Sequence, residues 1–324
     1  MTQRSRTIGF HASHEQFDPA RLLRLVQAAE RAGFDAAMCS DHWAPFASAQ
    51  GQSGFAWSWL GAAMATTMLP FGVVNAPGQR YHPAVVAQAA ATLEVMFPGR
   101  FWLAVGSGQQ INEHITGGPW PAKDERNDRL AEAVSVIRGL WVGDTVTRRG
   151  EYVTVSEAKL WTRPPRPPPL VGAAVTPPTA AWVATWADAL ITVVQPDEQL
   201  DRVVEAFRTN GGAGKPMYLQ AHLAYAPTDA EARAAAFEQW RTNTLPSSVS
   251  TDLRHPEQLE AAAKGVRPED MDAAVRISSD PGRHADWIRR DFARGFTAVY
   301  LHEVGPQQER FIEVFGREVL PRAR

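Results

Sequence analysis

Residues 7–42 read TIGFHASHEQFDPARLLRLVQAAERAGFDAAMCSDH, and this stretch decides the fold class. It contains two short apolar runs, Thr7–His11 and Phe34–Cys39, which predict strands. Between them, residues 19–32 repeat apolar side chains at helical spacing, with Asp18 placed to cap the helix and Gly33 to end it. Strand, helix and strand in this order are typical of a parallel βαβ unit. The turn after the first strand, HASHEQ, lacks the glycines of a dinucleotide-binding fingerprint.

The same alternation continues to the end of the chain. Six more apolar runs predict strands at Leu69–Asn75, Arg100–Val105, Leu170–Ala174, Ala189–Val194, Met217–Tyr225 and Thr297–Leu301. Eight such strands suit an α/β fold of the (β/α)8 TIM-barrel type, in one domain over residues 1–324, with a doubly wound open sheet as the alternative. Two stretches break the pattern. Residues 143–169 read as a polar hairpin with a proline-rich exit, and residues 244–280 as an irregular insertion placed to form a lid.

Composition narrows the range of partners. The 324 residues carry a net charge of −2, so nothing favours a nucleic acid or an anionic membrane as partner. Cys39 is the only cysteine, and no apolar run approaches the length of a membrane span. We therefore expect a cytoplasmic protein that acts on a small molecule. Eleven tryptophans fit core packing, an oligomer interface such as that of a homodimer, or an aromatic pocket for a planar ligand.

Polar residues gather where the predicted strands end, which is where TIM barrels carry their chemistry. Four of the nine histidines lie on or at the ends of predicted strands: His11, His42, His222 and His302. Several histidines meeting at one rim are hard to explain by packing alone, because each buried polar group needs a partner. The other strand ends carry Asp41, Asn75-Ala76, Gly106-Ser107-Gly108-Gln109 and Ala174-Val175-Thr176.

Several of these segments together resemble the luciferase-like monooxygenase superfamily. The resemblance is carried by Gly9-Phe10, Glu15-Gln16-Phe17, Ser40-Asp41-His42, residues 80–88 (RYHPAVVAQ), Phe97-Pro98-Gly99-Arg100 and Gly106-Ser107-Gly108 with Asn112-Glu113. Within the superfamily the chain is similar to the branch of deazaflavin (F420)-dependent glucose-6-phosphate dehydrogenases, and most similar to a group of FMN-dependent oxidoreductases in that branch. The match runs in order through roughly the first 140 residues.

The resemblance implies a bacterial-luciferase-like barrel that holds FMN or a deazaflavin at its mouth and moves hydride to or from a small organic substrate, or uses a reduced flavin with oxygen. It implies catalytic positions at His42, Glu15 and Gln109, with His42 as the acid/base group and Glu15 as the second candidate. It implies a bulge at Val73-Val74 behind the ring, where the family often has a non-proline cis peptide. The implied cofactor contacts are Asp41, His42, Val73, Val74, Asn75, Ala76, Gly106, Gly108, Gln109, Asn112, Ala174, Val175 and Thr176.

The departures from the branch bear on substrate and cofactor. Gln109 stands where the sugar-phosphate dehydrogenases have a glutamate, the expected proton donor, and an amide cannot donate in that way. Phe46 replaces a tryptophan, and the chain has only four lysines with which to bind a sugar phosphate. We therefore expect a substrate other than glucose 6-phosphate. We also expect FMN rather than the deazaflavin, because the loop at Ala174-Val175 lacks the family's glycine pair.

Two other functions stay open. The first is a metal-dependent TIM-barrel hydrolase, although the chain offers His11-x-x-His14 where that class has His-x-His and no histidine on the fifth or sixth strand. The second is a flavin-binding protein without turnover, which Gln109 keeps possible. We expect no metal site.

Overall fold

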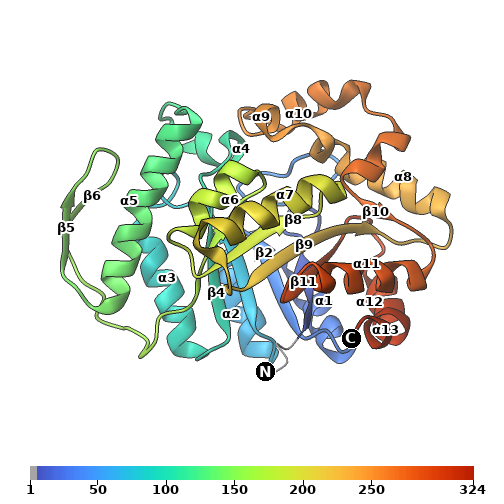
Figure 1. The fold of residues 1–324 in the computed structure, drawn as a ribbon, viewed down its shortest axis with the longest axis horizontal. Helices are drawn as coiled ribbons and strands as arrows, with labels where there is room; N and C mark the ends of the chain where they lie inside the picture. Colours follow the sequence, from blue (N-terminus) through green and yellow to red (C-terminus); the bar gives the residue numbers. More distant parts are fainter. Residues whose placement is uncertain (1–5) are drawn as a thin grey trace.

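The computed structural model describes residues 6–324, which form a closed barrel of eight parallel strands (Figure 1). The strands lie in the order β1 (Thr7–Ala12), β2 (Ala36–Ser40), β3 (Phe71–Asn75), β4 (Phe101–Val105), β7 (Leu170–Ala173), β8 (Ala189–Val193), β9 (Met217–Ala224) and β11 (Ala298–Glu303). Pairing of β8 with β9 and of β11 with β1 closes the ring. The predicted TIM barrel is therefore confirmed, and the open sheet is wrong.

Helices follow the strands and cover the outside of the barrel. They are α1 (Pro19–Arg31), α2 (Ala56–Thr66), α3 (Pro83–Met96), α5 (Lys123–Val142), α6 (Pro177–Ala184), α7 (Asp197–Phe207), α8 (Asp229–Trp240), α11 (Pro281–Ala293) and α12 (Gln308–Val314). The side chain of Asp18 accepts hydrogen bonds from the backbone of Ala20 and Arg21, as the predicted cap requires. None of the helices in residues 6–324 combines the length and the apolarity needed to cross a membrane.

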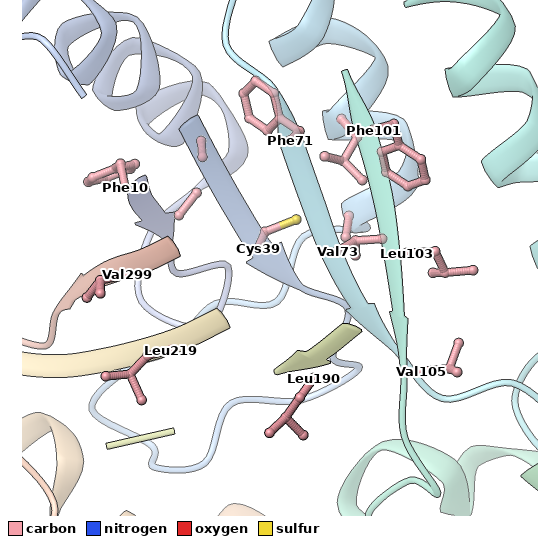
Figure 2. Packing of buried hydrophobic residues seen from close by; sticks show 14 of the residues in the cluster. Phe10, Cys39, Phe71, Val73, Phe101, Leu103, Val105, Leu190, Leu219 and Val299 are labelled. Atoms are coloured by element: carbon pink, nitrogen blue, oxygen red, sulfur yellow. The ribbon is translucent and has the colours of Figure 1, made fainter. Parts of the chain in front are cut away.

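Alternate residues of each strand face the helices or the interior of the barrel. Figure 2 shows Phe10, Cys39, Val73 and Leu103 on the helix-facing side, where they belong to the main hydrophobic core. A second, separate cluster fills the interior and consists of the intervening residues: Ala36, Met38, Trp102, Ala104, Val171, Ala189, Ile191, Ala298 and Tyr300. This alternation is the period-2 geometry of strands, and it is why one barrel has two cores.

Trp102 and Tyr300 fill the lower part of the interior. The Trp102 Nε1–H donates to the Tyr300 hydroxyl at 3.0 Å, which satisfies two buried polar groups at once. The two rings have room because glycines stand opposite them. A Cβ on Gly72 would lie 1.9 Å from the Trp102 ring, and a Cβ on Gly9 would lie 2.3 Å from the Tyr300 ring.

The first predicted insertion has the expected form. Residues 143–169 contain the antiparallel hairpin of β5 (Val146–Arg149) and β6 (Thr154–Ala158), which lies beyond α5 at the edge of the molecule (Figure 1).

The second insertion is more ordered than predicted. Residues 244–280 include the short helices α9 (Ser247–Ser250) and α10 (Pro256–Ala262), two 3-10 turns, Ala263–Gly265 and Pro268–Ala273, and β10 (Arg276–Ile277), which pairs with β9. A capping box of His255 and Gln258, together with Pro256 at the first position, starts α10. Leu259 of α10 packs on Phe46 and Ile111 beyond the carboxyl ends of the strands. We call residues 244–280 the lid segment.

Because Gly72 lies so close to Trp102, we expect a methyl group added at position 72 to lower the stability of the fold strongly. Gly72→Ala should lower the free energy of unfolding by about 1–3 kcal/mol or more, because the ring is enclosed and cannot move aside. Gly61→Ala is the matched control, since a Cβ there meets nothing within 4 Å in the middle of α2, where alanine is the better helix former. Urea denaturation of both variants measures the difference. Equal stability of the two variants would contradict this account of the interior.

Candidate active site

The ends of β1, β2, β9 and β11 bring the four strand-end histidines together at the carboxyl end of the barrel. The rings of His11 and His302 stack with their centroids 4.0 Å apart, and the ring of His222 lies 5.2 Å from that of His302. His42 joins this group through Glu15, which lies four residues after His11. The structure therefore brings these histidines to one rim of the barrel, as the sequence predicted.

Glu15 and His42 form a hydrogen-bonded pair at the centre of the site. Nδ1 of His42 contacts Oε1 of Glu15, and the Ser13 hydroxyl donates to Oε2 at 2.9 Å. The Glu15 side chain is 3% exposed and that of His42 is 19% exposed, so the imidazole separates a buried carboxylate from the solvent. Burial would raise the pKa of Glu15, but the charge and hydrogen bond of His42 outweigh it and hold that pKa at about 2. Glu15 is therefore ionised at neutral pH.

The three remaining histidines are buried in the neutral form. Desolvation lowers the pKa of His11 to about 3 and that of His222 to about 4, and it lowers the pKa of His302 as well. The Gln220 side-chain amide donates to Nδ1 of His302 at 3.1 Å and to Nε2 of His222 at 3.2 Å. Because the amide donates both bonds, Nε2 of His222 and Nδ1 of His302 each accept through a lone pair and carry no proton.

A second charged cluster stands at the ends of β2 and β3. Asn75 Nδ2 donates to Asp41 Oδ2 at 2.8 Å, and Arg80 Nη2 donates to the Asp41 backbone oxygen at 2.6 Å. The Arg80 backbone N–H donates to Glu113 at 2.7 Å. Asp41 and Asn75 were predicted from the sequence, whereas Arg80 and Glu113 were quoted only as part of the resemblance. Their pairing joins positions 33 residues apart, which no local pattern indicates.

The predicted site residues after β4 differ in what they contact. Gly108 has φ +81°, a left-handed conformation that favours glycine, and it lies beside Glu113. Oδ1 of Asn112 accepts from the backbone of Trp43 at 2.8 Å and Ala44 at 3.4 Å, so it holds the loop after His42. Gly106 approaches Ala173 of β7, and Gln109 opens the short helix α4 (Gln110–Glu113) without a side-chain hydrogen bond to its backbone.

The predicted bulge at Val73-Val74 is wrong. Strand β3 pairs in continuous register with β2 and with β4, and the peptide bonds of residues 6–324 include no cis bond. Two β-branched residues fit a regular buried strand. Val73 therefore faces the helices, as Figure 2 shows, and only Val74 packs against the interior cluster.

The loop after β7 leads into α6. Ala174 is buried in the main core, Val175 is 39% exposed, and Thr176 is the cap residue of α6. Pro177 and Pro178 occupy the first two positions of the helix, so two of the N–H groups that a helix start normally presents are missing.

A small surface pocket adjoins the ends of β3 and β4. Its lining residues are Ala76, Pro77, Gln79, Ser107, Gly108, Glu113, Arg126 and Arg129. Arg126 is 6% exposed, and its Nε has no hydrogen-bond partner. Lys123, one turn earlier on α5, donates to the Ser107 hydroxyl at 2.6 Å. The first turns of α5 thus present three cations to these loops.

In residues 6–324, no three His, Cys, Asp or Glu side chains come together in a way that could hold a metal ion.

Comparisons with known proteins agree on one family. The luciferase-like monooxygenase family matches residues 5–298. The F420-dependent glucose-6-phosphate dehydrogenase of Beutenbergia cavernae is 35% identical over 98% of this chain and 97% of its own length. The F420-dependent glucose-6-phosphate dehydrogenase 2 of Rhodococcus jostii is 33% identical over 100% and 99%. A solved F420-dependent secondary alcohol dehydrogenase, in complex with an F420-acetone adduct, is 31% identical with a TM-score of 0.91 over 99% of each chain.

The buried neutral histidines predict that the protein loses stability in acid. The pKa values of His11 and His222 are about 3 and 4 in the folded chain and about 6.5 when unfolded, so unfolding takes up protons between these values. The free energy of unfolding should therefore fall as the pH drops below about 6.5, by up to about 1.4 kcal/mol per pH unit for each histidine. Urea denaturation between pH 5 and pH 8 measures the slope, and His11→Gln should make it shallower. A flat profile would contradict the neutral state of these rings.

Proposed function

The chain belongs to the luciferase-like monooxygenase family, and we propose that it is an oxidoreductase that moves a hydride between a deazaflavin of the F420 type and a small organic substrate. The observation that carries the proposal is the buried Glu15–His42 pair at the barrel mouth. It is an acid/base group with a fixed orientation in the place where TIM barrels carry out catalysis.

The choice of cofactor rests on the relatives. The sequence favours FMN, yet the two dehydrogenases and the solved alcohol dehydrogenase described above are all named as F420-dependent, at 31–35% identity over nearly the whole chain. We therefore propose the deazaflavin, and FMN becomes the alternative that the experiment below separates.

The mouth contains unpartnered polar atoms that suit such a ring. Oδ1 of Asp41 and Oδ1 of Asn75 are buried without a hydrogen-bond partner, although Oδ2 of Asp41 is bonded. Buried acceptors without partners are rare, and both flavin and deazaflavin rings carry an N–H flanked by carbonyl groups. Asp41 and Asn75 would hold that edge, with the left-handed Gly108 letting the backbone come close.

The cations of α5 suit the phosphate of the cofactor tail. Lys123, Arg126 and Arg129 are three residues apart, so they share one side of the helix. Arg126 and Arg129 line the pocket beside Gly108, and Lys123 contacts Ser107 at its edge. Guanidinium groups bind phosphate in a fork of parallel hydrogen bonds. The start of α6, beside the implied cofactor contacts Val175 and Thr176, lacks two N–H donors because of Pro177 and Pro178. We therefore assign the phosphate to the α5 pocket.

When bound, the deazaflavin supplies the hydride acceptor or donor. The protein supplies the proton transfer: Nδ1–H of His42 donates to Glu15, which leaves Nε2 to accept the proton of a substrate hydroxyl as it becomes a carbonyl. The ionised Glu15 stabilises the positive charge that the imidazole then carries. In the reverse direction His42 returns the proton to the carbonyl oxygen.

Glucose 6-phosphate does not fit this proposal. Gln109 cannot replace a proton-donating carboxylic acid, and the chain has only four lysines. Lys123 contacts Ser107, and Lys215 donates to the carbonyl of Ala184 at the end of α6. The substrate is thus a different small organic molecule.

Removing the imidazole tests the catalytic role. His42→Ala should lower kcat by about 10²–10⁴-fold, the usual contribution of a positioned proton-transfer group, while the cofactor dissociation constant changes less. Glu15→Gln should give a smaller loss, since the imidazole remains. His82→Ala is the control, because that exposed ring contacts the carbonyl of Thr154, on the β5–β6 hairpin. Full turnover in a folded, cofactor-loaded His42→Ala protein would remove His42 from the mechanism.

A titration with four compounds tests the cofactor and the phosphate pocket together. Absorbance changes on adding F420 or FMN give the preferred ring. The phosphate-free forms, riboflavin and the F420 chromophore without its tail, measure ring binding alone. Arg126→Gln should weaken binding of the phosphate-bearing form by about ten- to a hundredfold, as expected for a hydrogen bond to a charged group, and leave the phosphate-free form unchanged. Arg138→Gln, farther along α5 and paired with Asp188, is the control. Tight FMN binding without F420 binding would reverse the assignment of the ring.

A further inference from the structure

We propose that His11 is a specificity-determining residue that binds an uncharged oxygen of the substrate, a hydroxyl or a carbonyl, and that the site thereby selects against anionic groups at this position. The inference rests on the proposed function, because it concerns the substrate of that same mouth. None of the roles given above to Glu15 and His42 involves His11.

The position of His11 gives it access to the inner face of the mouth. Its strand neighbour Phe10 packs in the helix-facing core, and Gly9 faces the ring of Tyr300 in the interior. By the alternation of a strand, His11 points inward on the same side as Gly9, one layer nearer the mouth. Its stacking on His302, the inward residue that follows Tyr300, agrees with this placement.

Both ring nitrogens of His11 lack a partner. The residue is only 2% exposed, and neither Nδ1 nor Nε2 makes a hydrogen bond to residues 6–324. By contrast, His302 on the same ring stack uses both of its nitrogens, with Gln220 at 3.1 Å and Gln16 at 3.4 Å. A fully buried imidazole with two open hydrogen-bonding positions is the feature that points to a ligand.

Burial keeps His11 neutral, because desolvation lowers the pKa of its ring, and the ring of His302 stacked on it is neutral as well. Gln16 donates to the carbonyl of Val304 at 2.7 Å, which leaves its Oε1 to accept from Nε2 of His302. Because Gln220 donates to Nδ1 of His302, that ring already carries its single proton on Nε2 and cannot take another without losing this bond. A neutral His11 has one N–H and one lone pair, and so it can donate to a carbonyl or accept from a hydroxyl.

The charge around His11 disfavours an anion. The ionised Glu15 lies near enough to act on the His11 ring, and its hydrogen-bonded partner is His42. A substrate carboxylate or phosphate at His11 would be repelled by this carboxylate at low dielectric. An uncharged oxygen has no such cost.

Three small molecules of similar shape test the inference: acetone, 2-propanol and acetate. Ligand-observed NMR measures their binding to the protein with and without bound cofactor, so the readout does not depend on turnover. We expect acetone and 2-propanol to bind and to compete with each other, and acetate to bind at least tenfold more weakly. Acetate binding as tightly as acetone, or no binding of acetone at any concentration at which the protein stays folded, would overturn the proposal.

Two variants assign the effect to His11. His11→Leu should weaken acetone binding by about tenfold, the contribution of one buried hydrogen bond, and His11→Gln should restore it because the amide also donates and accepts without charge. Thermal unfolding checks that each variant is folded. If His11→Leu does not fold, the acetone affinity of His11→Gln and the comparison of acetate with acetone test the proposal instead. Unchanged acetone affinity in folded His11→Leu removes His11 from substrate binding. Failure of both cofactors to bind would overturn the proposed function and leave these binding results standing.

Discussion

A closed barrel of eight strands has an interior of fixed width that side chains must fill. Here Trp102 and Tyr300 occupy its lower part, and they fit because Gly9 and Gly72 leave the space that other side chains would take. Above these rings the inward positions change from apolar to polar, with His11 on β1, Gln220 and His222 on β9, and His302 on β11. The apolar floor therefore confines polar groups to the mouth, where they are shielded from the solvent and are still open to a ligand.

Because the mouth is shielded from the solvent, each charged group there needs a partner within the protein. The Glu15 carboxylate is stabilised by His42, and Asp41 by Asn75 and Arg80. The histidines that lack a charged partner are neutral, because burial makes protonation too costly. The result is a site with two buried carboxylates that each have their own partner, and with a surrounding set of neutral donors and acceptors. Such a set suits proton transfer to an oxygen better than the binding of an anion.

The sequence predicted those features that depend on local pattern. Apolar runs of five to nine residues between helical repeats identified each barrel strand, and the strand ends identified Asp41, His42 and the other rim histidines. It did not predict α10, because the Ser- and Pro-rich composition of residues 244–280 obscured the start signal at Pro256. The contact of Arg80 with Glu113 depends on tertiary packing, so no spacing indicated it. The bulge at Val73-Val74 came from the resemblance alone, and the residues themselves form a regular strand.

The lid segment packs against the loop that carries His42. Leu259 packs on Phe46, and the ring of Phe46 lies edge-on to that of His42 with 5.0 Å between centroids. Glu260 of the same helix accepts a hydrogen bond from the backbone of Ser48 at 2.8 Å, so the lid is attached to the loop that carries His42. Leu259 thus supports the ring that packs against the imidazole, and Glu260 holds the backbone of the same loop. The orientation of the His42 ring therefore depends on a helix far along the chain, since Ser48 and Glu260 are 212 positions apart.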